Sequence, residues 1–286
     1  MRAEPLSRPH AYHAEGPVWW PEWGGLRYVD MLAGDVLQLG ESGSVTRTHV
    51  GKVAATLRPR AGGGAVVAGE RGFLLGRADD LSDLVAGPDL WSDNGIRFND
   101  GACDPAGAFY CGTMAYDATT GAGSLWRLGA DQAPAQQVLT DLTISNGLGW
   151  SPDGRTAYLN DTPTRTVSAF DWSAETGLTE RRPFVTLGDD VEGNPDGLCV
   201  DAEGGVWVAL YGGSAVHRYS PEGSLDAVIE LEPTQVTACT FGGADLDTLY
   251  VTTSRENLSD DEQPLAGSLF ACQPGVRGLP ALTYAG

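Results

Sequence analysis

The feature that most constrains the fold of this chain is a loosely repeated unit of about 45 residues. Six short runs rich in Val, Tyr, Trp, Leu and Thr each follow turn chemistry of the Gly or Asp-x-x-Gly kind. The centres of these runs are 39, 43, 48, 49 and 43 residues apart, at Tyr28, Val67, Tyr110, Tyr158, Trp207 and Tyr250. A unit of this length holds four short strands with their turns, which is one blade of a β-propeller. The repeat therefore predicts an all-β, six-bladed β-propeller.

The remaining pattern favours one ring over several domains. The chain lacks long apolar stretches of helical periodicity, and no linker rich in Pro, Gly and Ser divides it. We expect residues 1–286 to form a single propeller domain; a β-sandwich or an irregular all-β arrangement with accidental spacing is the alternative. Because an open sheet edge invites aggregation, a terminal strand should complete another blade. Either "ALTYAG" at the C-terminus or the segment before Glu15 can supply that strand.

Composition limits the partners of the protein. The 38 acidic and 18 basic residues give a net charge of −20, which repels phosphate backbones and anionic lipids. We therefore expect neither nucleic acid nor a membrane as a partner. The sequence shows neither the apolar run of a signal peptide nor a membrane span, which takes roughly 18 apolar residues. The five scattered cysteines form no C-x-x-C pair, which favours buried, reduced, strand-borne thiols over disulfides or a zinc site. We expect a cytoplasmic protein that is a monomer or a weak homo-oligomer.

Four oxygen-bearing side chains precede the aligned strand centres by 11 to 13 residues. They are Glu15, Asn99, Asn146 and Asp196, each followed within two residues by glycine, in "AEGP", "FNDG", "SNGL" and "PDGL". In a propeller, equivalent positions of successive blades converge on the central channel, so side chains remote in sequence meet there. The second and sixth units carry Ala54–Thr56 and Ala238–Cys239 at this offset, which leaves the ring of donors open on one side.

These four residues have the chemistry of a cation site. Asn-Gly and Asp-Gly are also hairpin signals, but a second turn signal downstream, such as "SPDG" after Asn146, already serves each hairpin. Carboxylate and amide oxygens bind hard divalent cations, Ca²⁺ first and Mg²⁺ or Mn²⁺ next, and Zn²⁺ also accepts carboxylates. Without a cation, Glu15 and Asp196 would repel each other in a narrow channel. The residues therefore predict one divalent metal cation bound in the central channel.

The same segments resemble a known family. "AEGPVWW", "RFNDGACDPAGAFYCGTM", "ISNGLGWSPDG" and "NPDGLCVDAEGGVWVA" are similar to signature segments of the gluconolactonase, regucalcin (senescence marker protein) and luciferin-regenerating enzyme family. The resemblance implies a six-bladed propeller that binds one divalent cation, with hydrolysis of a sugar (aldono-) lactone as the commonest activity. Carried over position by position, it places the metal ligands at Glu15, Asn146 and Asp196. It places Asn99 beside the metal and the substrate, and makes Arg97 a substrate contact.

Two positions depart from the family pattern. Sugar-binding members often have a glutamate where "GTMAYD" places Asp117, a further candidate for substrate binding that is one methylene shorter. Members usually carry an acidic or small residue near Trp20, so "VWWPEW" implies a bulkier pocket wall. Trp19, Trp20 and Trp23 could line the channel mouth as a sugar platform, although packing between blades is the commoner fate of such residues.

Lactone hydrolysis requires a polarised carbonyl, an attacking water and a route for protons. We take Asp196 as the general base, with ligation alone as its alternative role. Arg97 and Asn99 can donate hydrogen bonds to sugar hydroxyls or to the lactone oxygen; a surface salt bridge is the alternative for Arg97. Asp100 is a candidate for orienting Arg97 or a water. The four histidines form no spaced pair and none lies at the inner-strand offset, so we do not expect a His-dependent hydrolase.

The predicted site admits two rival functions. A cation that polarises a carbonyl can also polarise the phosphoryl oxygen of a phosphotriester, which would make the protein a phosphotriesterase-like hydrolase. A propeller that binds calcium or a protein without turnover is the other alternative. Arg97 and Asn99 favour the lactonase, because a metal store needs no hydrogen-bond donors directed at a sugar.

Overall fold

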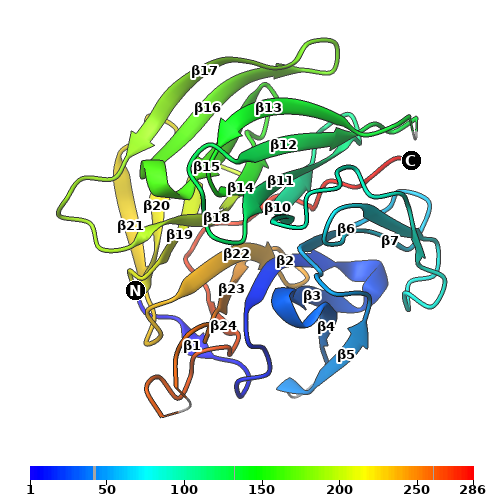
Figure 1. Cartoon of the computed structure of the whole chain (residues 1–286). Coiled ribbons are helices and arrows are strands. Elements are labelled where there is room, and N and C mark those ends of the chain that lie inside the picture. Colours follow the sequence, from blue (N-terminus) through cyan, green and yellow to red (C-terminus); the bar gives the residue numbers. More distant parts are fainter. Residues whose placement is uncertain (41–42, 132, 260) are drawn as a thin grey trace.

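Six four-stranded antiparallel sheets surround a common axis as the blades of a propeller (Figure 1). The structure, a computed structural model, describes residues 1–40, 43–131, 133–259 and 261–286. The all-β, six-bladed fold predicted from the repeat is confirmed, and the β-sandwich alternative is wrong. Within the described ranges, no helix is long and apolar enough to cross a membrane.

The chain builds each blade from the axis outward. The strands, in that order within successive blades, are β2 (Ala14–Trp20), β3 (Gly25–Asp30), β4 (Asp35–Leu39), β5 (Val45–His49); β6 (Thr56–Pro59), β7 (Ala65–Ala68), β8 (Phe73–Gly76), β9 (Val85–Ala86); β10 (Ile96–Cys103), β11 (Phe109–Ala115), β12 (Gly123–Leu128), β13 (Gln136–Leu142); β14 (Ser145–Trp150), β15 (Thr156–Asp161), β16 (Thr166–Ser173), β17 (Gly177–Thr186); β18 (Asn194–Val200), β19 (Val206–Tyr211), β20 (Ala215–Tyr219), β21 (Leu225–Glu230); and β22 (Val236–Gly242), β23 (Thr248–Thr253), β24 (Phe270–Cys272), β1 (Glu4–Pro5). Short 3₁₀ helices in the connections include η1 (Pro21–Trp23), η2 (Met31–Ala33) and η4 (Thr162–Thr164).

The residues used to align the six units all lie in the second strand of a blade, on β3, β7, β11, β15, β19 and β23. Aromatic side chains on or beside these strands pack across neighbouring blades. The ring centroids of Tyr110 and Trp150 are 5.7 Å apart, and those of Trp207 and Phe241 are 5.6 Å apart. The repeat therefore marks strands that bury large side chains against the next blade, which explains its Tyr and Trp content.

The N-terminal segment closes the ring. Of the two candidates for this role, the segment before Glu15 is confirmed, because β1 pairs with β24 at the outer edge of the sixth blade. The C-terminal residues "ALTYAG" do not extend a sheet: Tyr284 is buried and forms only an isolated bridge with Arg60. Pro280, just before them, lacks the N–H that a ladder needs. The C-terminal tail instead crosses the axis behind the blades in Figure 1.

The glycines that follow the predicted ligands lie where neighbouring inner strands touch. A Cβ on Gly147 would lie 2.3 Å from the backbone nitrogen of Leu198, and one on Gly197 would lie 2.4 Å from the Cβ of Ala238. Both glycines lie inside innermost strands, β14 and β18, and neither forms a hairpin turn. In each pair, the Asn or Asp is therefore a predicted site residue, and the glycine allows the next blade to approach closely.

We expect Gly197→Ala to destabilise the protein by about 1–3 kcal/mol, because the added methyl overlaps a rigid neighbouring strand. Urea unfolding followed by far-UV circular dichroism measures this loss. Gly62→Ala is the matched control, since a Cβ there meets no atom within 4 Å. Equal stability of the two variants would contradict the packing role assigned to Gly197.

Candidate metal centre and active site

The four predicted oxygen donors all lie at irregularities of innermost strands. The register of β2 with β3 shifts directly after Glu15, and the shifts in the third, fourth and fifth blades contain the other donors, Asn99, Asn146 and Asp196. A β-bulge re-aims a side chain that would otherwise follow the strict alternation of a strand. The exposed fractions of the four residues are only 3–4%. Bulges thus direct polar side chains into the interior of the ring, as the spacing predicts.

Two oxygen atoms of this cluster have no hydrogen-bond partner among the described residues. They are Oδ1 of Asn146 and Oδ1 of Asp196, both buried. The amide nitrogen of Asn146 donates to the hydroxyl of Thr162 over 3.2 Å, which fixes the orientation of that amide. A buried polar atom without a partner costs free energy, unless it binds a ligand.

The donor set fits a hard divalent cation. Glu15 and Asp196 supply carboxylates, and Asn146 supplies an amide oxygen, which are ligands typical of Ca²⁺ and related ions. Within the described part of the chain, no group of three or more His, Cys, Asp and Glu side chains is placed to hold a metal ion. The predicted donor set accordingly combines two carboxylates with the amide oxygen of Asn146.

The electrostatics of the cluster favour a positive ion. Burial raises the pKa of Glu15 well above its ordinary value, and the nearby carboxylates of Asp196 and Asp100 raise it further. Burial also raises the pKa of Asp196, with Asp100 adding to the shift and a hydrogen bond from Asn146 opposing it. These carboxyl groups resist ionisation together unless a cation offsets their charge.

Arg97 and Asn99 form the neighbouring part of the site. Nη1 of Arg97 donates to Oδ1 of Asn99 over 2.8 Å, and the amide nitrogen of Asn99 donates to the Ser145 carbonyl over 3.0 Å. The side-chain oxygen of Asn99 is thus occupied by Arg97, and its amide nitrogen bonds the residue that precedes Asn146. Arg97 is buried and forms no ion pair with any described residue, so its alternative as a surface salt bridge is wrong.

Two other candidates point elsewhere. Asp100 accepts a 2.7 Å hydrogen bond from its neighbour Gly101, and its carboxylate faces Thr56 and Arg58, so it does not orient Arg97. Asp117 is exposed and accepts hydrogen bonds from the backbone nitrogen and the hydroxyl of Thr119, at 3.0 and 2.7 Å. These bonds lower the pKa of Asp117. The structure therefore does not bring Asp117 into the buried cluster.

His13 also lies beside this cluster, although it does not stand at the 11- to 13-residue offset that identified the four predicted donors. Its Nε2 lies 3.9 Å from Oε1 of Glu15, and its Nδ1 lies 2.8 Å from the hydroxyl of Ser254. Burial lowers the pKa of His13 to about 3, with a further contribution from Arg97, so the imidazole is neutral. The period of two along an extended chain places residues 13 and 15 on one face, and this signal could have identified His13.

Comparison with known proteins identifies the family of this chain. Residues 13–255 match the family model described as "SMP-30/Gluconolactonase/LRE-like region". The chain belongs to the SMP-30/gluconolactonase/LRE-like family. Regucalcin of Sus scrofa is 35% identical to it over 298 aligned positions, which cover 100% of this chain and 99% of that protein.

Solved structures of this family share the fold. A calcium-binding protein, regucalcin of Agrobacterium tumefaciens strain C58, superposes with a TM-score of 0.90 at 30% identity, covering 99% of this chain and 97% of the other. A gluconolactonase of Xanthomonas campestris superposes with a TM-score of 0.74 at 25% identity, covering 93% and 87% of the two chains.

In this member of the SMP-30/gluconolactonase/LRE-like family, the tryptophans lie away from the oxygen cluster. Trp19 and Trp20 end strand β2, whereas Glu15 begins it, and the two tryptophans line a hollow with Pro280 of the tail. The ring of Trp19 stacks on that of Tyr250 in the sixth blade, with centroids 5.6 Å apart. Trp23 is buried. The packing between blades that we expect as the commoner fate of such residues is therefore seen for Trp19, at the end of β2 away from Glu15.

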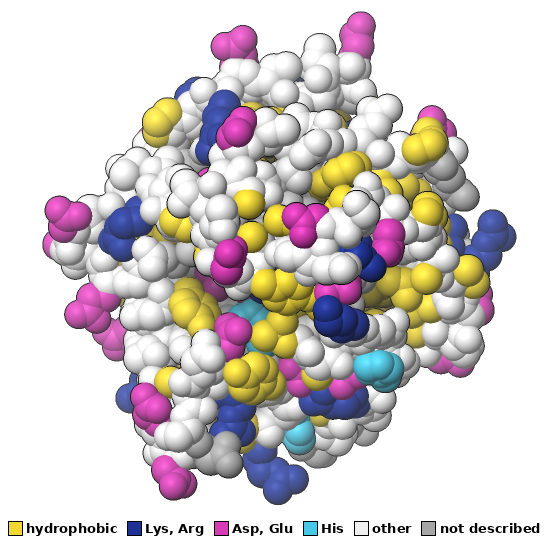
Figure 2. Space-filling model, viewed as in Figure 1, with side chains coloured by type: hydrophobic (Ala, Val, Ile, Leu, Met, Phe, Trp, Pro, Cys, Tyr) yellow, Lys and Arg dark blue, Asp and Glu magenta, His cyan; other side chains and the backbone are white. Residues whose placement is uncertain are grey.

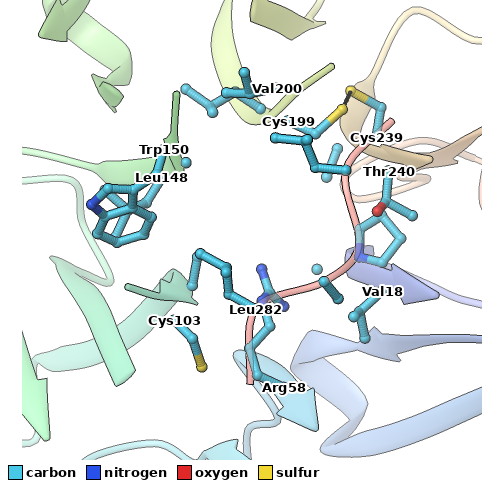
Figure 3. A pocket seen from close by; sticks show the side chains of 18 of the residues that line it. Val18, Arg58, Cys103, Leu148, Trp150, Cys199, Val200, Cys239, Thr240 and Leu282 are labelled. Carbon is cyan, nitrogen blue, oxygen red and sulfur yellow. Dashed lines mark hydrogen bonds between the residues drawn. The ribbon is translucent and has the colours of Figure 1, made fainter. Parts of the chain in front are cut away.

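A cavity of about 130 Å³ lies between the oxygen cluster and the tail. Figure 3 shows its walls, formed by innermost strands, with Leu282 of the tail crossing beside Arg58. Cys199 and Cys239 meet in its wall, with sulfur atoms 3.6 Å apart, and all five cysteines are free and lie on strands. The tail crosses this end of the channel, and the opposite face of the ring is turned away from the tail. Figure 2 shows that face, with hydrophobic side chains gathered near its centre among charged ones.

Proposed function

We propose that this protein is a divalent-cation-dependent lactonase that opens a sugar lactone. The proposal rests on the buried cluster of Glu15, Asn146 and Asp196. In this cluster, Oδ1 of Asn146 and Oδ1 of Asp196 have no hydrogen-bond partner among the described residues. Membership of the SMP-30/gluconolactonase/LRE-like family and the similarity to a gluconolactonase support lactone hydrolysis. Calcium is our first choice of cation, because the donors are all hard oxygens.

Glu15, Asn146 and Asp196 would hold the cation. When bound there, it supplies a Lewis acid for the carbonyl and for the negative charge that develops on its oxygen. Asp196 is also our choice of general base: one oxygen of its carboxylate would bind the cation, and the other would accept the proton of an attacking water.

Arg97 and Asn99 position the substrate. Asn99 fixes one end of the Arg97 guanidinium through its 2.8 Å hydrogen bond, and the ring of Tyr116 lies 5.7 Å from the guanidinium carbon. A guanidinium held in this way keeps its remaining N–H groups directed, so it can donate to a sugar hydroxyl at little entropic cost. Asp117, next to Tyr116, lies on the exposed side, where it can contact a substrate hydroxyl from the rim.

A calcium-binding propeller without turnover is the second candidate, because the Agrobacterium relative is described as a calcium-binding protein. The two functions differ in a pH-stat assay with glucono-, galactono-, xylono- and arabinono-lactone. We expect acid release from at least one lactone, abolished by chelator and restored by added Ca²⁺. Calcium binding without acid release from any lactone would favour the second candidate and overturn the lactonase.

A further inference from the structure

His13 connects the proposed ligand Glu15 to the sixth blade. Its side chain lies between Oε1 of Glu15, 3.9 Å from Nε2, and the hydroxyl of Ser254, 2.8 Å from Nδ1. His13, Glu15 and Ser254 are buried, with exposed fractions of 6%, 3% and 0%. The backbone is fixed as well, because the N–H groups of Tyr12 and His13 both donate to Oδ1 of Asp30. The imidazole therefore has one well-defined position.

The hydrogen bonds around Ser254 decide which nitrogen of His13 carries the proton. The backbone N–H of Glu256 donates to the Ser254 hydroxyl oxygen over 2.9 Å. The hydroxyl proton then has two acceptors, Nδ1 of His13 at 2.8 Å and the carbonyl of Tyr12 at 3.4 Å. When the hydroxyl donates over the shorter 2.8 Å contact, Nδ1 accepts and the proton of the neutral imidazole lies on Nε2.

The charges around the ring agree with this tautomer. Nε2 faces the carboxylate of Glu15, so a bare lone pair there would meet negative charge. The Glu256 carboxylate lies 3.8 Å from Nδ1, but Ser254 is closer to that atom and Glu256 is partly exposed, with 31% of its side chain accessible.

We propose that His13 is a positioning residue: its Nε2–H holds the Glu15 carboxylate in the orientation that binds the cation. The proposal rests on the proposed function, because it takes Glu15 as a ligand. At 3.9 Å the two atoms are beyond hydrogen-bond distance, so the proposal requires the Glu15 side chain to move toward Nε2 when it binds the cation. Groups that orient a metal ligand in this way typically contribute about 10–100-fold to metal affinity.

Calorimetric titration of the full chain with Ca²⁺ tests the proposal. We expect His13→Leu to weaken Ca²⁺ binding by about 10–100-fold, because the donor to Glu15 is lost. We expect His13→Gln to recover most of that loss, because its amide nitrogen can replace Nε2–H. His217→Leu is the matched control, since His217 is also buried and contacts a hydroxyl, that of Tyr219. It should bind Ca²⁺ as the wild type does.

The outcomes separate the two proposals. Wild-type affinity in folded His13→Leu overturns the positioning role, and so does equal weakening in His13→Leu and His13→Gln. A wild-type protein that binds no divalent cation overturns the proposed function instead. If His13→Leu does not fold, Ser254→Ala provides the test of the positioning role. Loss of the hydroxyl leaves the imidazole free to adopt the tautomer that carries its proton on Nδ1. We expect Ser254→Ala to bind Ca²⁺ several-fold more weakly than the wild type, and unchanged affinity in this variant contradicts the positioning role.

Discussion

Replacement of Asp196 by asparagine is expected to lower the rate of lactone opening by about 10²–10⁴-fold, the usual contribution of a positioned general base. The true loss should lie at the upper end, because the same substitution removes a charged ligand of the cation. Asparagine keeps the size of the side chain and cannot accept a proton from water. Turnover in a pH-stat at saturating Ca²⁺ measures the effect.

The fold of this variant should remain intact, and its stability provides a second measurement. Asp196 is a buried acid whose ionised form is disfavoured by burial and by Asp100. A neutral amide avoids this cost, so we expect chelator-treated Asp196→Asn to melt at a higher temperature than the chelator-treated wild type at neutral pH. Asp117→Asn is the control: it alters an exposed rim residue, and we expect it to change KM more than kcat. Full activity in Asp196→Asn would exclude the proposed mechanism.

The spacing of the repeat was sufficient to predict the ring and the positions of the oxygen donors. A propeller relates its blades by rotation, so a residue at one offset in one blade predicts its counterparts in the others. Glu15, Asn146 and Asp196 obey this rule, although they come from three separate sheets. For the strand that completes the last blade, the sequence left two candidates, one at each terminus. Both termini can reach an open sheet edge, and no local sequence pattern distinguishes them.

Features that depend on packing between segments far apart in the chain could not be predicted from the sequence. Ser254, the partner of His13, is 241 residues away and belongs to a blade that supplies no predicted ligand. The resemblance implied a bulkier pocket wall near Trp20, and the structure places Trp20 at the end of β2, with Glu15 near its start. A rise of about 3.3 Å per residue over the five steps from Glu15 to Trp20 separates these two side chains along β2. The exposure of Asp117 follows from a local turn with Thr119, which the alignment of motifs does not resolve.

The second large effect concerns stability as a function of pH. Burial raises the pKa of both Glu15 and Asp196 in the folded protein above the values they have when unfolded. The folded state then holds more protons than the unfolded state over the interval between the two pKa values. In the presence of chelator, the contribution of these two groups to the free energy of unfolding is therefore complete below their pKa in the unfolded state, about 4. It declines as the pH rises toward their pKa in the folded state. Each unit of pKa difference corresponds to about 1.4 kcal/mol.

Saturating Ca²⁺ should reverse this decline. The cation binds the ionised carboxylates, so binding releases protons and its affinity increases with pH through the same interval. A ligand at a thousand times its Kd stabilises a folded protein by about 4 kcal/mol. We expect scanning calorimetry between pH 5 and pH 8 to show melting temperatures that diverge, falling in chelator and holding in Ca²⁺. The double variant Glu15→Gln, Asp196→Asn is the control, and both of its curves should be flatter. Parallel curves for the wild type with and without Ca²⁺ would mean that these two carboxylates do not share a cation.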